Sequence, residues 1–339
     1  MRKQVALITG ANGEIGHGLV EALVARGELG IVALDLNPVS EALIPHLEAA
    51  LVGDILDRNL IERLISEYDV REIYHLAALL STRSEFTPDT AHRVNVGGTL
   101  DLLRLAADQA RRGGHPVTFL FPSSIAIYGI ESRQAKAAAG RVGEGSFNHP
   151  TTMYGCNKLY CEHLGRYFSE HYGQLDANFR KSGVDFRALR FPGLMSAQTT
   201  PSGGTSDWGP ELLHYAASGK RYECFVSPDA RLPFMAMPDA VRAIVELAHA
   251  PAASLRQRIF NIGAFSASAA EIAERAERAF AGADLGWATP GARAAIVDSW
   301  PADVDDSAAR DQWGWRPQYD ADRAFDEYLI PELRRRYNR

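Results

Sequence analysis

The residues of this chain that could do chemistry begin with a tyrosine and a lysine four positions apart. Tyr154 and Lys158 lie in TTMYGCNKLYCEHLGRYF, and on a helix this spacing places both side chains on one face. A lysine ammonium group close to a phenol favours the phenolate and lowers its pKa from about 10. The pair therefore predicts a general base that works near neutral pH.

Two serines precede this pair at the end of the apolar stretch VTFLFPSS. Ser124 lies thirty residues before Tyr154, and Ser123 is its neighbour. Serines at the end of a strand either cap a turn or hydrogen-bond a reacting oxygen, and both interpretations are open for each residue alone. Beside a tyrosine base, a serine at the carboxyl edge of a sheet indicates a site for moving a proton on a substrate oxygen.

A glycine-rich turn near the start of the chain predicts a dinucleotide site. ITGANGEIG places Gly10, Gly13 and Gly16 between an apolar strand and a helix, where glycines permit a tight turn and let backbone N–H groups approach a pyrophosphate. Asp35 ends the second strand, where a carboxylate accepts hydrogen bonds from ribose hydroxyls and repels a 2′-phosphate. NAD is therefore favoured over NADP, and a turn without a ligand is the alternative. Asp54 suits either the adenine edge or the N-cap of a helix over 56–66.

The elements that must position these residues alternate along the first half of the chain. Continuously apolar strands separated by amphipathic helices predict an α/β fold with a doubly wound parallel sheet. After residues 184–193 the alternation weakens, which indicates a second, smaller α/β region for substrate, and RIFNIG (258–263) is apolar enough to rejoin the main sheet. The predicted cofactor region spans 1–192 and about 256–281; the predicted substrate region spans about 193–255 and 282–339.

Composition narrows the classes of protein. The chain has 339 residues, a net charge of −6 and 46% apolar residues, with no run of five like charges, so we expect a globular protein that binds neither nucleic acid nor a membrane. No apolar run approaches the roughly 18 residues of a membrane span. The three cysteines have no metal-ligand spacing, which predicts no metal site, reduced thiols and a cytoplasmic location. We expect Cys156 and Cys161 to pack within a helix bundle.

The ordered set ITGANGEIG, Asp35, HLAA, VNVGGT, PSSIAIYG and YGCNK resembles the extended short-chain dehydrogenase/reductases. The resemblance implies catalysis by Ser124, Tyr154 and Lys158, with Lys158 also on the nicotinamide ribose. It implies an NAD site formed by Gly10, Asn12, Gly13, Glu14, Ile15, Gly16, Asp35, Asp54, Ile55, Leu76, Ala77, Ala78, Tyr154 and Lys158. It further implies a homodimer through helices at about 90–112 and 153–173.

Within that family, RFPG followed by GGTSDW is similar to the short-chain type of L-threonine 3-dehydrogenase. This resemblance implies oxidation of the 3-hydroxyl of threonine, or of a close small β-hydroxy acid, with Tyr154 as the base. Ser81, Ser124, Tyr154, Thr205 and Trp300 would contact the substrate. A plain linker at 201–209 and core packing of Trp300 are the competing interpretations, and a nucleotide-sugar epimerase or dehydratase with bound NAD is the alternative function. A non-catalytic NAD sensor would not need Tyr154.

Two stretches depart from the family pattern. We expect residues 132–145, rich in small and charged residues, to form a mobile surface insertion. The stretch 171–183 also lengthens a loop, and we expect both loops to lie near the carboxyl edge of the sheet, where they could reshape the pocket. Arg231 is expected to form a surface salt bridge.

Overall fold

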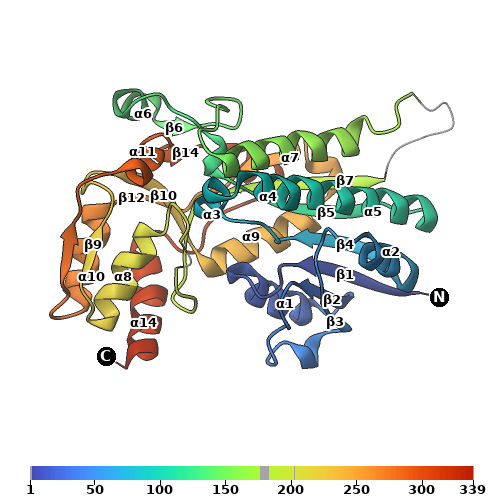
Figure 1. Ribbon diagram of the computed structural model, residues 1–339, viewed down its shortest axis with the longest axis horizontal. Helices are drawn as coiled ribbons and strands as arrows, with labels where there is room; N and C mark the ends of the chain where they lie inside the picture. The colour runs from blue at the N-terminus through green and yellow to red at the C-terminus, as the bar shows by residue number, and fades with distance from the viewer. Residues whose placement is uncertain (1, 176–182, 202, 339) are drawn as a thin grey trace.

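A computed structural model describes residues 2–175, 183–201 and 203–338 of the chain. In this part of the chain, seven parallel strands form the main sheet in the order β11, β7, β5, β4, β1, β2, β3 (Figure 1). Their bounds are β1 Lys3–Thr9, β2 Gly30–Asp35, β3 Ala49–Val52, β4 Tyr68–His75, β5 Val117–Ser124, β7 Val184–Phe191 and β11 Ile259–Asn261. The strand order reverses between β1 and β4, which opens a crevice at the carboxyl edge. The predicted doubly wound α/β fold is confirmed.

Helices cover both faces of this sheet because its strands are apolar on both sides. Val5 and Leu7 of β1 pack into one cluster and Ala6 and Ile8 into the other, as the alternation of strand side chains requires. The first face carries α2 Arg58–Glu67, α5 Gly98–Gly113 and α7 Met153–Glu170, and the second carries α1 Glu14–Arg26 and α9 Met237–His249. Figure 1 shows α3 Ser81–Phe86 and α4 Pro88–His92 beside α7.

A smaller region, at the C-terminal end of the molecule in Figure 1, is built from short strands. One sheet has the order β12, β10, β8, with bounds β8 Gly193–Met195, β10 Arg231–Ala236 and β12 Phe265–Ser268, and β9 Tyr222–Cys224 pairs with β13 Leu285–Trp287. Its helices are α8 Trp208–Ser218, α10 Ala269–Ala279, α11 Ala292–Asp298, α12 Ser307–Trp313, α13 Ala321–Arg323 and α14 Ile330–Tyr337, with a π turn η5 Ala324–Leu329. Short 3-10 turns are η1 Ile44–His46, η3 Ile125–Ile127 and η4 Ala252–Ser254.

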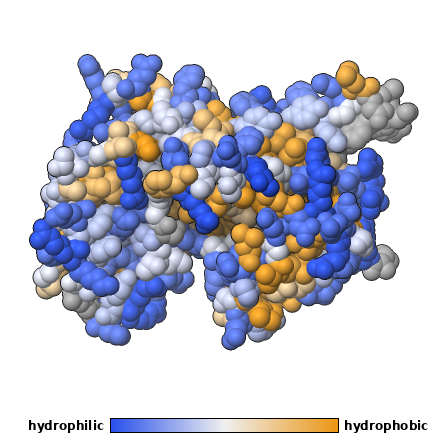
Figure 2. Space-filling model, viewed as in Figure 1, coloured by the Kyte–Doolittle hydropathy of each residue, from blue (hydrophilic) through white to orange (hydrophobic). Residues whose placement is uncertain are grey.

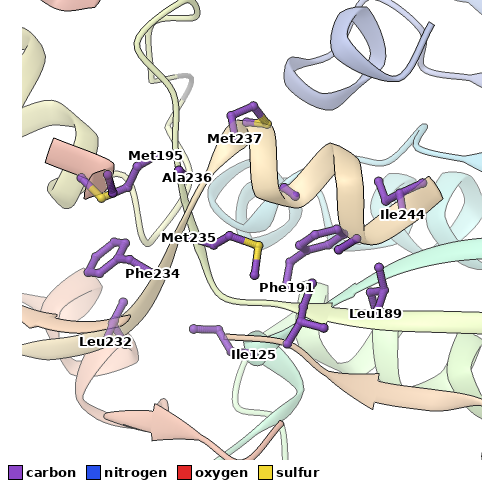
Figure 3. Packing of buried hydrophobic residues seen from close by; sticks show 14 of the residues in the cluster. Ile125, Leu189, Phe191, Met195, Leu232, Phe234, Met235, Ala236, Met237 and Ile244 are labelled. Carbon is purple, nitrogen blue, oxygen red and sulfur yellow. The ribbon is translucent and has the colours of Figure 1, made fainter. Parts of the chain in front are cut away.

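One apolar core joins the two regions. Figure 3 shows Leu189 and Phe191 of β7, Met235 of β10 and Ile244 of α9 packed together where the main sheet gives way to the smaller one. Phe234, on the opposite side of β10, meets the ring of Trp208 edge to face with ring centres 5.0 Å apart. Because the same buried cluster extends into both regions, the smaller region is held firmly against the carboxyl edge of the main sheet.

The predicted border between the two regions stays a prediction. Two helices pack on the region other than the one to which their residue numbers assign them. The helix α9 belongs to the predicted substrate region by its residue numbers, yet it packs on α1, β5 and β7 of the main sheet. The helix α10 falls within the predicted cofactor region, yet it packs on α8 and β12 of the smaller region. The strand β11 does join the main sheet beside β7, as the apolar stretch RIFNIG predicts.

The prediction of a mobile surface insertion at 132–145 is wrong. Residues 133–139 form the helix α6 Arg133–Ala139, and β6 Arg141–Val142 pairs with β14 Asp303–Val304. The Ser132 hydroxyl caps this helix by accepting a hydrogen bond from the backbone N–H of Ala135. Figure 1 shows α6 and β6 beside α11 and β14. Small and charged residues do not prevent order here, because the segment packs on the C-terminal part of the chain.

The prediction that the stretch 171–183 lies near the carboxyl edge is also wrong. This stretch ends immediately before β7, and the carbonyl of Gly183 accepts a hydrogen bond from the backbone N–H of Val117 at the start of β5. Both strands therefore begin there, so the described ends of the stretch lie at the amino edge of the sheet. Residues 176–182 lie outside the described residues.

Candidate functional site

A cleft of about 530 Å³ opens between the main sheet and the smaller region. Figure 2 shows the surface hollowed between these two parts. Every residue that the sequence predicts for the site lines this cleft. The list is Gly10, Asn12, Gly13, Glu14, Ile15, Gly16, Asp35, Asp54, Ile55, Leu76, Ala77, Ala78, Ser81, Ser124, Tyr154, Lys158, Thr205 and Trp300. The structure brings these residues together, while their individual roles remain predictions.

The glycine loop has the shape that a dinucleotide needs. Gly10 has φ +73°, and a Cβ on it would lie 2.7 Å from the backbone nitrogen of Ala77; a Cβ on Gly16 would lie 2.2 Å from the carbonyl oxygen of Ala11. A Cβ on Gly10 would therefore block the close approach of the loops after β1 and β4, and a Cβ on Gly16 would block the packing of α1 on its own loop. No side chain of the described residues caps α1 at Gly13, which leaves its first N–H groups available to an anion. These observations fit the pyrophosphate of NAD.

The two acidic residues near the adenosine side have different surroundings. Asp35 accepts hydrogen bonds from the backbone N–H groups of Asn12, at 3.0 Å, and Asn37, at 3.1 Å, so its carboxylate is fixed at the edge of the cleft. Asp54 accepts from Leu56 at 2.9 Å and lines the cleft. The alternative in which Asp54 caps the following helix is wrong, because Asp57 is the N-cap of α2 and accepts from two N–H groups of its first turn.

The two serines at the end of β5 face different surroundings. Ser123 also lines the cleft, but it is buried and donates its hydroxyl hydrogen bond to Glu162 at 2.5 Å, so its proton is already used within the protein. Ser124 is less buried and lines the cleft, and its Oγ accepts a bond from the backbone N–H of Ala126. The Ser124 hydroxyl keeps its own proton to donate, so it is the better candidate for holding a substrate oxygen.

Tyr154 and Lys158 occupy the first two turns of α7, where both line the cleft. Lys158 Nζ donates to the carbonyl of Pro122 at 2.6 Å and lies 5.5 Å from the centre of the Tyr154 ring. Among the protein's own groups, burial raises the pKa of Tyr154, contrary to the predicted lowering, and burial lowers the pKa of Lys158 to about 8. For the protein's own groups, the predicted lowering of the Tyr154 pKa is therefore wrong. The cost of burying the phenolate exceeds the attraction of Lys158, whose ammonium group points to the Pro122 carbonyl.

A π turn positions the segment after β4. The helical stretch 88–113 contains η2 Arg93–Gly97, and π turns are frequent at functional sites. The buried Asn95 side chain of this turn accepts a hydrogen bond from the backbone N–H of Leu79 at 2.8 Å and donates to its carbonyl at 3.1 Å. The chain is thereby held as it runs from β4 toward Ser81. VNVGGT contains this asparagine, but nothing in its spacing indicates the contact with Leu79.

The stretch that includes Thr205 is a docked turn rather than a plain linker. The Ser81 hydroxyl oxygen accepts hydrogen bonds from both the backbone N–H and the hydroxyl of Thr205, each at 3.0 Å. Asp207 accepts from the backbone N–H groups of Gly203, at 2.8 Å, and Gly204, at 2.6 Å. Ser81 and Thr205 are both buried, so the linker interpretation is wrong for residues 203–209. Residue 202 lies outside the described residues.

Trp300 fits both interpretations that the sequence leaves open, which are packing in the core and a place in the substrate cleft. Its side chain is buried, and it also lines the cleft. Its indole Nε1 is buried without a hydrogen-bond partner among the described residues. Buried indole N–H groups usually find a partner, so this unsatisfied donor is unusual, and Trp300 both packs in the core and forms part of the cleft wall.

Several residues of the cleft were not predicted from the sequence. They include Leu79, Leu80, Pro122, Ile125, Phe191, Pro192, Leu194, Gly204, Ser206 and Asp207. Asp207 could have been found, because it lies two residues after Thr205 in the same turn. Arg231 does not line the cleft, and it pairs with Glu271 at 2.6 Å as the surface interpretation predicts. No cluster of three possible metal ligands occurs in the described ranges.

The doubly wound sheet, the glycine loop and the Ser124, Tyr154 and Lys158 side chains around one cleft define an extended short-chain dehydrogenase/reductase. The family model described as "NAD dependent epimerase/dehydratase family" matches residues 6–263. The chain belongs to this family, and it is an NAD-dependent enzyme that acts on a CH–OH group.

The similar proteins include L-threonine 3-dehydrogenases and proteins named epimerase/dehydratase from Staphylococcus. Mitochondrial L-threonine 3-dehydrogenase of Bos taurus is 33% identical over 94% of this chain and 80% of its own length. A monomeric L-threonine 3-dehydrogenase from a metagenome has a solved structure that is 34% identical, covers 98% of this chain and 99% of that one, and has a TM-score of 0.84. The holo form of L-threonine dehydrogenase from Cupriavidus necator is 33% identical over 96% and 99%, with a TM-score of 0.83.

Proposed function

We propose that this enzyme oxidises the 3-hydroxyl of L-threonine, or of a close small β-hydroxy acid, to the 3-oxo acid with NAD. The observation that carries the proposal is the charge of the cleft. Among the described residues that line it, Lys158 is the one lysine or arginine, and its ammonium group is bonded to the Pro122 carbonyl. A nucleotide sugar would bring a second diphosphate to a cleft without a free cation. A small zwitterion carries no diphosphate, so it does not need a free cation of this kind.

The acidic side chains of the cleft support the same choice. Glu14 and Asp207 both line it, and burial together with the Asp207 charge raises the pKa of Glu14, although a hydrogen bond from Thr199 acts in the opposite direction. Asp207, in the Thr205 turn, suits a substrate ammonium group and opposes a second diphosphate there, whereas Glu14 lies at the start of α1 on the NAD side. The Thr205 turn and the Trp300 side chain then form the part of the cleft wall that would lie against the rest of the substrate. The similarity to L-threonine 3-dehydrogenases supports this assignment.

The cofactor residues follow from the shape of the loops. The N-terminus of α1 with Gly10, Gly13 and Gly16 would hold the pyrophosphate of NAD, and Asp35 would accept the ribose hydroxyls. Asp54 and Ile55 would lie on the adenine side, with Leu76, Ala77 and Ala78 along the adenosine. NAD, when bound, supplies the hydride acceptor and a positive charge.

In the proposed mechanism, Tyr154 removes the proton of the substrate hydroxyl while Ser124 holds the oxygen by a hydrogen bond. Because burial raises the pKa of Tyr154, the phenolate requires positive charge nearby. The Lys158 ammonium group, 5.5 Å from the ring centre and itself fixed by the Pro122 carbonyl, provides part of that charge. Lys158 would also hydrogen-bond the nicotinamide ribose.

The direct test mixes the purified protein with NAD and L-threonine and follows the absorbance of NADH. We expect the absorbance to rise with threonine, and we expect no interconversion of UDP-hexoses. No NADH with threonine or any small hydroxy amino acid, together with epimerisation of a UDP-hexose, would overturn the proposal in favour of the epimerase alternative.

The proposed base has a matched control on its own helix. Tyr154→Phe should keep NAD affinity and lose turnover by a factor of about 100 or more, the size of a general-base contribution. Tyr160 lies on α7 with 54% of its surface exposed, so Tyr160→Phe should leave turnover unchanged. Unchanged turnover in Tyr154→Phe would remove Tyr154 from the mechanism while leaving the dehydrogenase activity itself in place.

We further propose a homodimer through helices at about 90–112 and 153–173. Tyr160 and Tyr167, seven residues apart on α7, are 54% and 42% exposed, an apolar stripe that a second copy would cover. A similar solved structure is that of a monomeric L-threonine 3-dehydrogenase, so the oligomeric state of this chain is to be measured by light scattering. No helix in the described part of the chain is long and apolar enough to cross a membrane. A cytoplasmic location stays a prediction.

A further inference from the structure

The segment that lengthens the chain between β5 and α7 ends against the wall of the cleft. The helix α6 lies beside α11, and α11 leads directly into Ser299 and Trp300 (Figure 1). The backbone N–H of Ile130 donates to the carbonyl of Ser299 at 2.8 Å, and Thr151 and Ser299 share a hydroxyl contact at 3.2 Å. The two ends of the segment are therefore tied to the residue next to Trp300.

Lys136 makes the central contact of this junction. It is a buried lysine, 7% exposed, and Nζ donates to the carbonyl of Val297 at 3.0 Å. The same carbonyl oxygen accepts the backbone N–H of Trp300 at 3.2 Å. One acceptor with two lone pairs thus joins the lysine and the tryptophan.

The charges around Lys136 come from three elements. Asp298 of α11 and Asp229 of the turn before β10 favour the ammonium group, while Arg133 on α6 opposes it. Arg133 in turn pairs with Asp229 and lies 3.7 Å from Asp298. Burial lowers the pKa of Lys136 to about 8, so the group is mainly charged at neutral pH. A cation at the carbonyl end of a helix is favourable, which suits the end of α11.

We propose that Lys136 is a positioning residue for the substrate side of the cleft: it holds the end of α11 through Val297 and thereby fixes Trp300. The effect on substrate affinity rests on the proposed function. The effect on α11 is independent of the proposed function. Removing the ammonium group takes one donor from the Val297 carbonyl, so the carbonyl that accepts the Trp300 backbone N–H is no longer held by α6.

The experiment compares Lys136→Met with Lys220→Met in the full chain. Methionine keeps the length and apolar stem of lysine, and Lys220 is an exposed lysine after α8 that serves as the matched control. Hydrogen–deuterium exchange of peptides covering 292–301 reports on α11 without any substrate. Steady-state kinetics with the hydroxy amino acid that wild type oxidises best then report on the cleft.

We expect faster exchange in 292–301 for Lys136→Met, with unchanged exchange in α7. We also expect a KM for the amino acid about tenfold higher, the effect of losing about 1.4 kcal/mol of ground-state binding, with kcat and NAD affinity kept. Lys220→Met should match wild type in both measurements.

Two results would overturn the inference. One is unchanged exchange in 292–301, and the other is faster exchange there with an unchanged KM. If wild type oxidises no hydroxy amino acid, the proposed function fails, and the exchange result alone still decides whether Lys136 fixes the end of α11.

Discussion

The buried ion pair between Arg190 and Glu162 offers the sharpest test of how α7, the helix that carries Tyr154 and Lys158, is anchored. Glu162 lies one turn after Lys158 on α7, and Arg190 lies near the end of β7. Arg190 Nε and Nη2 donate to the two carboxylate oxygens at 2.9 and 2.7 Å, and both side chains are almost fully buried. Burial lowers the pKa of Arg190, but the Glu162 carboxylate outweighs burial and raises it.

Arg190→Met would leave the Glu162 carboxylate in the core with the Ser123 hydroxyl as its remaining recorded side-chain donor. Breaking a buried pair from one side costs about 3–5 kcal/mol, because a charge stays buried without compensation. For a chain of this size, roughly 2 °C per kcal/mol predicts a fall of about 6–10 °C in the unfolding midpoint. Replacing both partners removes the stranded charge, so Arg190→Met combined with Glu162→Leu should cost less than Arg190→Met alone.

Circular dichroism melts of the single and double variants measure this coupling. Arg231→Met is the control, because Arg231 pairs with Glu271 at the surface, where such pairs contribute at most about 1 kcal/mol. The reasoning is refuted if Arg190→Met lowers the midpoint no more than Arg231→Met does. It is also refuted if the double variant loses the sum of the two single losses.

Three other predictions need simpler measurements. The hydrogen bond to Glu72 raises the pKa of His249, so the protonated imidazole stabilises the fold below about pH 6.5 and this contribution is lost as the pH rises through the raised value. Calorimetry should therefore show that His249→Gln lowers the midpoint more at pH 6 than at pH 9, and an equal loss would contradict the pairing. Asp35→Asn should weaken NAD about tenfold in titration and narrow its preference over NADP; an unchanged ratio would remove Asp35 from the ribose site. Cys156 is exposed, contrary to the predicted packing, and burial raises the pKa of both other thiols to about 11. A thiol reagent at pH 8 should thus label one cysteine in the folded protein, and rapid labelling of all three would contradict this burial.

The cofactor half of the cleft could be predicted from the sequence because its parts are close together in the chain. Gly10, Gly13 and Gly16 lie close together in one strand–loop–helix unit, and Asp35 ends the next strand. The Tyr154 and Lys158 pair is likewise a matter of helical spacing. Each of these features depends on local geometry, which residue types and intervals describe directly. The parallel, doubly wound sheet likewise follows from the alternation of strands and helices, whereas the order of its strands does not.

The pKa of Tyr154 could not be predicted in the same way. Spacing places Lys158 on the same helix face, but the direction of its ammonium group is set by the Pro122 carbonyl at the end of another element. The cost of burying the phenolate depends on everything packed around it. Spacing alone therefore predicts an activated pair, whereas in the folded protein burial raises the pKa of Tyr154 and lowers that of Lys158 to about 8, so the phenolate needs further positive charge in the cleft.

The substrate half of the cleft is beyond sequence reasoning for a different physical reason. Ser81 and Thr205 meet across 124 positions of the chain, and Lys136 reaches Val297 across 161. No interval or periodicity specifies such contacts, because they form only when α6, α11 and the Thr205 turn close on the same edge of the sheet. The composition of 132–145 is also that of a mobile loop, but Lys136 within it is buried and bonded to the Val297 carbonyl. The predicted NAD residues thus form a local motif that spacing describes, whereas Trp300 lies at a junction of remote segments, and for this reason its contacts could not be predicted.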